Sequence, residues 1–205
     1  CRAIIPVLRA RRIGQHIFTE AVSQHAAKEG TPTMGGVCFI LPMLLVLLLL
    51  IVLGVCRGVD CTAPALAVCL GVANGMIGFV DDYAKLCHKG NQGLTSKQKL
   101  LLQIIVASLY LWAMSALGKM NTVVEVPFLN QSWDMGIFYY IASLIIIVGV
   151  VNSTNLTDGI DGLASSVTLV ACMGLSVLGF LRMNGLAIVG GSVMIGGMIG
   201  FLVFN

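Results

Sequence analysis

The sequence predicts an all-α integral membrane protein, a polytopic bundle of transmembrane helices. Hydrophobic residues make up 58% of its 205 residues and charged residues only 10%, whereas charged residues account for roughly a quarter of an average soluble domain. The apolar residues also fall in six long runs, most of them close to the ~20 residues that a helix needs to cross the hydrocarbon core of a bilayer. Composition and spacing together predict six membrane spans.

The six expected spans are separated by loops that hold almost all of the charge. The first span, from Met34 to Cys56, contains no charged residue. Thr95 and Gln98 form a capping box that predicts the start of the third span, and Gly136 marks the start of the fourth. The expected spans cover residues 34–56, 63–80, 100–118, 136–151, 163–181 and 186–204.

Two further features concern the loops and the ends of the chain. Residues 123–134 alternate in polarity around Pro127 and Asn130, which predicts a short hairpin between two spans. The chain begins without Met and stops inside an apolar run at Asn205. We therefore expect one transmembrane domain over residues 1–205 that is partial, lacking the start of its first helix and its C-terminal helices.

The distribution of charge predicts the orientation of the spans. Segments 1–33, 81–99 and 152–162 hold nine of the twelve Lys and Arg residues, six of the nine acids and all three His. Positive residues are retained in the cytoplasm during insertion, so these segments are predicted to be cytoplasmic. The net charge of +3 favours contact with anionic head groups or substrates over nucleic acid, and topology alone explains it equally well.

The first motif is the segment Lys28-Glu-Gly-Thr-Pro-Thr-Met-Gly-Gly36. Thr31 suits a helix N-cap and Pro32 suits the first turn that follows it, so capping alone explains these two residues. It does not explain Lys28, nor the adjacent glycines, which permit close approach of a ligand. A helix N-terminus with a lysine beside it is a natural anion site.

The second motif places Asp81, Asp82 and Lys85 at the end of the second span. Ionisable groups at membrane depth cost about 2.5–3.5 kcal/mol each, so adjacent carboxylates there favour a functional role. Consecutive helical residues point about 100° apart, and the two acids are therefore expected to have different duties, one toward a metal or phosphate and one toward a neighbouring helix. The alternative is a simple ion pair with Lys85 at helical spacing.

The third motif is the densest and runs from Asn152 to Ala164. It carries Asn152, Asn155, Asp158 and Asp161, with a glycine after each acid, and is predicted to be a tightly turning polar loop between two spans. Such a loop offers oxygen ligands and acceptors for ring N–H and ribose hydroxyl groups. Asp161 alone has a simpler explanation, as the cap of a helix that begins near Gly162.

Together these segments resemble the phospho-N-acetylmuramoyl-pentapeptide transferases of bacterial cell-wall synthesis. The match follows the order and approximate spacing of that family's motifs along the whole chain, in segments 28–36, 81–85, 93–99 and 152–164. The resemblance implies a bundle of about ten transmembrane helices, a homodimer, and a location in the bacterial cytoplasmic membrane with the active site on the cytoplasmic face. It implies transfer of phospho-N-acetylmuramoyl-pentapeptide from UDP to undecaprenyl phosphate, which gives lipid I and UMP, with Mg²⁺ as cofactor.

The resemblance also assigns roles to individual residues. It implies a catalytic carboxylate set and a group of substrate-binding residues, with Lys85 and Lys99 on phosphates and Lys28, Asn155 and Asp158 around the nucleotide. The implied catalytic residues are Asp81, Asp82 and Asp161, and the implied substrate-binding residues are Lys28, Thr31, Lys85, Lys99, Asn152, Asn155 and Asp158.

The chain departs from the family pattern in two places. Ala21 and Val22 stand where the family often has Gly-Pro. The family's magnesium-binding aspartate and histidine-rich loop are expected beyond Asn205, so no metal ligand is assigned within the chain.

Two other functions remain open on the sequence. One is a related transferase that moves another sugar phosphate from UDP to a polyprenyl phosphate. The segment from Thr31 to Gly36 argues against it, because that segment looks like the muramoyl branch's own signature. The other is an ion-coupled secondary transporter that uses Asp81, Asp82 and Asp158, although transporters place such groups near the midplane of repeated halves.

Overall fold

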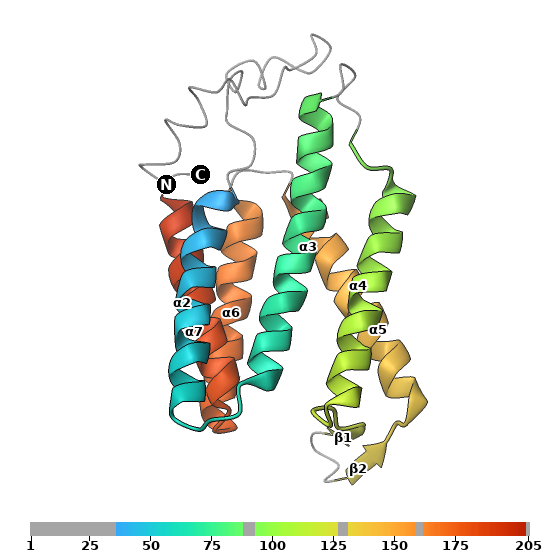
Figure 1. Cartoon of the computed structure of the whole chain (residues 1–205), viewed down its shortest axis with the longest axis vertical. Helices are drawn as coiled ribbons and strands as arrows, with labels where there is room; N and C mark the ends of the chain where they lie inside the picture. The colour runs from blue at the N-terminus through green and yellow to red at the C-terminus, as the bar shows by residue number, and fades with distance from the viewer. Residues whose placement is uncertain (1–35, 88–92, 127–130, 159–161, 204–205) are drawn as a thin grey trace. The chain divides into compact units, whose positions relative to one another are not determined.

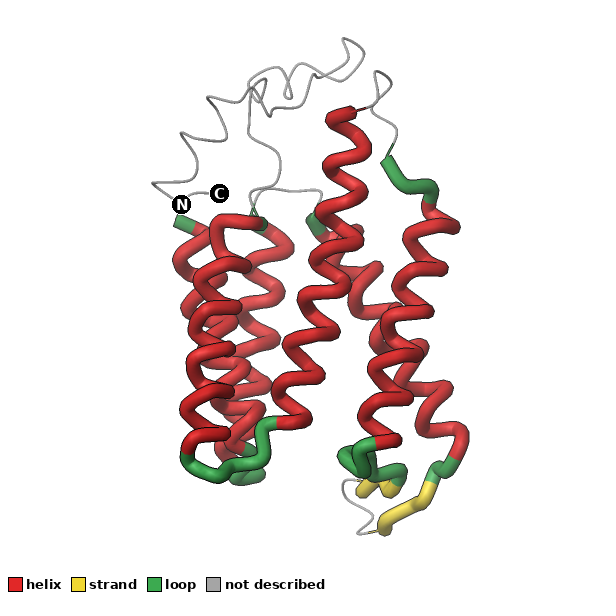
Figure 2. The backbone as a smooth tube through the Cα atoms, in the orientation of Figure 1, coloured by secondary structure: helices red, strands yellow, loops and turns green. Residues whose placement is uncertain are grey.

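The computed structural model describes residues 36–87, 93–126, 131–158 and 162–203. Within these ranges the chain forms six helices and one pair of strands (Figures 1 and 2). The elements are α2 (Val37–Cys56), α3 (Thr62–Cys87), α4 (Ser96–Ala116), β1 (Val123–Val126), β2 (Gln131–Asp134), α5 (Ile137–Thr157), α6 (Leu163–Leu181) and α7 (Gly185–Leu202).

The helices confirm the predicted fold class of a polytopic helical membrane protein. Five of the described helices, α3 to α7, are long and apolar enough to cross a membrane, and α2 is apolar from Ile40 to Cys56. Large apolar side chains such as Leu45 and Ile145 stay more than half exposed. An apolar exterior of this kind suits contact with lipid rather than water.

Two predicted helix ends are wrong, because α3 and α5 both continue past the expected end of the apolar run. α3 reaches Cys87 and so contains the whole second motif, and α5 reaches Thr157 instead of ending near residue 151. In α5, the hydroxyl of Thr154 donates to the carbonyl of Val150 (2.9 Å) and that of Thr157 to Ser153 (2.7 Å). A side chain that donates to a carbonyl of the preceding turn satisfies its own hydrogen-bonding group within the helix. A run of polar residues therefore does not by itself end a helix.

The described helices belong to two compact units. The first contains α6, α7, most of α2 and the end of α3 from Asp81, and the second contains α4, α5, the strands and the rest of α3. In the first unit α6 packs along α7, and α2 also lies beside α7 (Figure 1). Glycines make these contacts close: a Cβ at Gly179 would lie 2.8 Å from that of Ala187, and one at Gly197 would lie 2.9 Å from Cγ of Met43.

In the second unit α4 and α5 form an antiparallel pair joined by the hairpin. Thr95 caps α4 through the expected capping box with Gln98, and Gly136 is the N-cap of α5. The predicted hairpin is also confirmed, with β1 antiparallel to β2 and Val123 opposite Asp134 (Figure 2). The sequence thus predicted the elements that connect the two helices.

An exposed ion pair joins two loops of the second unit at the hairpin end of α4. The ammonium of Lys119 donates to a carboxylate oxygen of Asp60, just before α3. That hydrogen bond, with others from Thr62, holds the pKa of the Asp60 carboxyl well below its usual range. The pair links the start of α3 to the segment that follows α4.

We expect Gly179→Ala to lower the thermal unfolding midpoint of the detergent-solubilised protein. The added methyl would lie 2.9 Å from the backbone nitrogen of Ile188, and overpacking of this kind typically costs about 1–3 kcal/mol. Gly174→Ala on the same helix is the matched control, because a Cβ there meets nothing within 4 Å and alanine favours helix. Equal midpoints for the two variants would contradict close packing of α6 on α7.

Candidate active site

The last turns of α3 hold a lysine between two carboxylates. Nζ of Lys85 lies 2.9 Å from Oδ2 of Asp81 and 3.3 Å from Oδ1 of Asp82. These are the i to i+4 and i to i+3 spacings at which side chains meet on one helix. The ion pair that the sequence left as an alternative is therefore present, and one ammonium serves both acids.

The two acids differ in their surroundings, as their angular separation on the helix predicts. The side chain of Asp81 is 6% exposed and that of Asp82 is 43% exposed. Lys85 keeps 39% of its side chain exposed, so its ammonium remains accessible to an anion. The group combines one nearly buried carboxylate with a carboxylate and an ammonium that solutes can reach.

The segment after α3 returns to this group at Gly93. A Cβ at Gly93 would lie 2.5 Å from Oδ1 of Asp81, 3.0 Å from its backbone oxygen and 2.9 Å from Cε of Lys85. Only a residue without a side chain fits at this distance. Gly93 therefore lets the loop backbone close over the buried acid.

A second group of polar residues lies on α4 and α5. Nδ2 of Asn152 donates to Oε1 of Gln103 (2.7 Å) and to the carbonyl of Val148 (2.9 Å). Gln103 is 3% exposed, so a neutral amide pair is held between two apolar helices. An amide side chain can both donate and accept hydrogen bonds, and which of its two atoms faces a given neighbour is decided by the groups around it.

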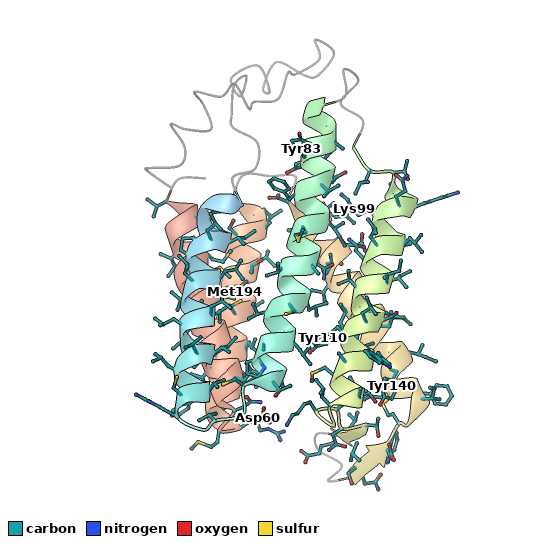
Figure 3. All side chains as sticks on the ribbon, viewed as in Figure 1. Asp60, Tyr83, Lys99, Tyr110, Tyr140 and Met194 are labelled. Carbon is teal, nitrogen blue, oxygen red and sulfur yellow. The ribbon has the colours of Figure 1, made fainter. Side chains whose placement is uncertain are left out.

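Three more expected site residues lie on the same two helices, α4 and α5. Asn155 is exposed one turn beyond Asn152, and Asp158 is the exposed C-cap residue of α5. Lys99 lies in the first turn of α4, as Figure 3 shows. Asn152 and Asn155 therefore lie on the last turns of a helix, and the prediction that they belong to a loop is wrong.

The described site residues are divided between the two units. Asp81, Asp82 and Lys85 form the first group. Lys99, Asn152, Asn155 and Asp158 belong to the second unit. Lys28, Thr31 and Asp161 lie outside the described residues. The N-cap of α6 is Gly162, with a φ of 74°, and the simpler interpretation of Asp161 as a cap concerns a residue outside the described ranges.

The donor chemistry of the first group suits Mg²⁺. This ion is usually held by one or two carboxylates, with water and substrate phosphates filling the remaining positions, and Asp81 and Asp82 supply two carboxylates. Within the described ranges no cluster of three or more His, Cys, Asp or Glu side chains could hold a metal alone. The two acids are thus suited to a magnesium ion shared with a phosphorylated substrate.

Sequence reasoning missed two residues of these groups. Gln103 interrupts a run of Leu, Ile and Val in the third span, and a polar residue inside a span is itself a signal of a partner or a function. Gly93 stood in a recognised segment, but its contact with Asp81 depends on the path of the loop. The sequence could therefore indicate a role for Gln103, but it could not indicate the contact of Gly93 with Asp81.

These features define a multi-pass membrane protein with two carboxylates and an ammonium clustered at the end of a transmembrane helix. The family model described as glycosyl transferase family 4 matches residues 64–205. The chain belongs to this family. A second model, the phospho-N-acetylmuramoyl-pentapeptide-transferase signature 1, matches residues 28–40, which confirms the resemblance that the motifs indicated.

Curated relatives named phospho-N-acetylmuramoyl-pentapeptide-transferase agree with both models. The chain is 35% identical over 202 residues to that of Clostridium novyi (strain NT), 36% over 204 residues to that of Bacillus subtilis (strain 168), and 38% over 201 residues to that of Listeria monocytogenes (serotype 4b, strain CLIP80459). Each match covers 98% of this chain and 60% or 61% of the relative. The chain thus spans about three fifths of the length of these curated relatives.

Removing Lys85 is expected to destabilise the protein more than removing the charge of Asp82. Lys85→Met leaves the nearly buried Asp81 without this cation, a loss that we place at about 1–3 kcal/mol because Lys85 is partly exposed. Asp82→Asn leaves the closer Asp81 pair in place and is expected to change stability by less than about 1 kcal/mol. Thermal unfolding midpoints in one detergent measure the order, and the reverse order would contradict the assignment of Asp81 as the stronger partner.

Proposed function

We propose that the protein of which this chain forms part transfers phospho-N-acetylmuramoyl-pentapeptide from UDP to undecaprenyl phosphate, producing lipid I and UMP. The observation that carries the proposal is the lysine-bridged pair of acids on α3 in a chain of this family. Phosphoryl transfer needs alignment and neutralisation of charge more than covalent help. Two carboxylates and an accessible ammonium supply groups for both.

The proposed reaction is a direct displacement. An oxygen of the lipid phosphate attacks the phosphorus nearest the sugar, a new P–O bond forms, and the bridging P–O bond to UMP breaks. The lipid phosphate is largely dianionic near neutral pH, since its second pKa is about 6, so a strong base is not required. Asp81 positions the nucleophile or accepts its remaining proton. A covalent aspartyl intermediate is the alternative route.

The chain's own residues have distinct parts in this proposal. Lys85 exchanges its carboxylate partners for phosphate oxygens, while Lys99 contacts a second phosphate. Asp81, Asp82 and Asp161 form the catalytic carboxylate set, and within it Asp81 and Asp82 would hold Mg²⁺ together with the substrate. Bound Mg²⁺ supplies neutralisation of the phosphate charge.

Recognition of the donor substrate is assigned to the remaining residues of the motifs. Lys28, Asn155 and Asp158 are proposed to surround the nucleotide. Thr31 and Asn152 complete the set, Thr31 at an expected helix N-terminus and Asn152 through its amide. The site is proposed to face the cytoplasm from the bacterial inner membrane, in a homodimer.

The first measurement is magnesium-dependent UMP release by the full-length protein from UDP-N-acetylmuramoyl-pentapeptide and undecaprenyl phosphate. We expect release that needs both substrates and falls by roughly a hundredfold or more in Asp81→Asn and Asp158→Asn. Asp60→Asn is the matched control, because Asp60 is an exposed carboxylate at the opposite end of α3. Release by both site variants at the wild-type rate would overturn these assignments.

The two alternatives give different results in the same preparation. UMP release that requires UDP-N-acetylglucosamine instead would identify the related sugar-phosphate transferase. Solute flux into vesicles without UMP release would identify a transporter. A labelled enzyme isolated from the UDP substrate alone, without lipid phosphate, would replace direct displacement by the covalent route.

Gly93→Ala is expected to lower kcat/KM roughly tenfold or more, because its methyl would displace Asp81 or Lys85 and small misplacements reduce rates strongly. Gly78→Ala is the control within α3, since a Cβ at that glycine meets nothing within 4 Å. Initial rates of UMP release measure both variants. Equal rates would show that the close approach of Gly93 does not position the acids.

A further inference from the structure

A buried polar contact between α4 and α5 involves a residue outside the recognised motifs. Gln103 lies two turns into α4, only 3% of it is exposed, and its Oε1 accepts a 2.7 Å hydrogen bond from Asn152. An amide surrounded by apolar helices is retained only if its hydrogen bonds are made. Its partner here belongs to the densest motif of the sequence.

The direction of this hydrogen bond follows from a third group. The carbonyl of Val148 can only accept, so the atom of Asn152 that faces it at 2.9 Å is the amide nitrogen. The same nitrogen faces Gln103, which must then present its oxygen. Both Nδ2 hydrogens of Asn152 are thus engaged, and its Oδ1 is directed away from these two partners as an acceptor.

We propose that Gln103 is a positioning residue that holds Asn152 so that Oδ1 accepts a hydrogen bond from the UDP-linked substrate. The chemistry of Oδ1 selects a donor, such as the ring N–H of the base or a sugar hydroxyl, and it excludes a phosphate oxygen. Gln103 itself is too deeply buried to contact substrate, so it acts through Asn152. This inference rests on the proposed function, in which Asn152 is a substrate-binding residue.

The same helix pair provides a control for a purely structural role. Oγ of Ser115 and the hydroxyl of Tyr140 form a second hydrogen bond between α4 and α5, at 3.0 Å. Ser115 lies twelve residues along α4 from Gln103, which corresponds to about 18 Å of helix. Figure 3 shows Lys99 and Tyr140 toward opposite ends of this pair. Tyr140→Phe therefore removes a cross-helix hydrogen bond far from Asn152.

The experiment uses the full-length protein and measures kcat/KM for the UDP substrate together with the thermal unfolding midpoint. We expect Gln103→Leu to lower kcat/KM roughly 10- to 100-fold, because the amide of Asn152 can then turn. Gln103→Glu keeps an acceptor oxygen and is expected to recover most of that loss. In an Asn152→Ala background Gln103→Leu should lower kcat/KM no further, and Tyr140→Phe should leave it unchanged at a similar midpoint.

Three results would overturn the inference while the wild type remains active. The first is a kcat/KM of Gln103→Leu close to the wild-type value. The second is a double variant in which the losses of kcat/KM from Gln103→Leu and Asn152→Ala multiply. The third is a loss of kcat/KM in Tyr140→Phe equal to that in Gln103→Leu. Absence of UMP release from the folded wild type is a different result. It would overturn the proposed function, and this inference with it, so the two failures are distinguishable.

Discussion

The requirement that polar groups at membrane depth find a partner governs this structure. A bilayer core offers no water to satisfy them, and several polar residues in the described spans bond to their own helix or to a neighbouring one. Thr154 and Thr157 bond to their own helix. Lys85 does so by pairing with two acids on α3. Gln103 instead crosses to Asn152 on the next helix, and that contact ties α4 to α5.

Packing of the apolar helices depends on a second constraint, the absence of a hydrophobic driving force between helices in lipid. Close van der Waals contact takes its place, and small residues allow it. Gly179 on α6 and Gly197 on α7 both lie where a side chain would meet a neighbour. In this unit the glycines set how closely the helices approach. Gly93 has the same property in a loop, where it brings backbone against Asp81 rather than helix against helix.

The sequence predicted the fold class and the connections better than the helix ends. The capping box at Thr95 and the hairpin after α4 are local patterns, so they could be read directly and are confirmed. The ends of α3 and α5 lie beyond the expected ends because polar residues continue both helices: hydroxyl side chains of α5 bond back to the preceding turn, and Lys85 pairs with two acids of α3. The motif residues were recognisable by resemblance. Gln103 could be noticed as a polar residue inside a span, but its partner and the contact of Gly93 depend on how separate segments meet, which no single-sequence pattern encodes.

The two polar groups differ in how firmly they hold their atoms, and this difference fits the chemistry of the proposed substrate. Lys85 shares one ammonium between two carboxylates and stays partly exposed, so a phosphate can replace either acid as its partner. The amide of Asn152 has both hydrogens engaged and cannot turn without losing a bond inside apolar surroundings. Charge that must be neutralised during transfer needs ligands that exchange, whereas a base or sugar must be recognised by acceptors that do not move. The ionic group on α3 meets the first demand with ion pairs that can exchange partners. The amide group on α4 and α5 meets the second with hydrogen bonds that fix its orientation.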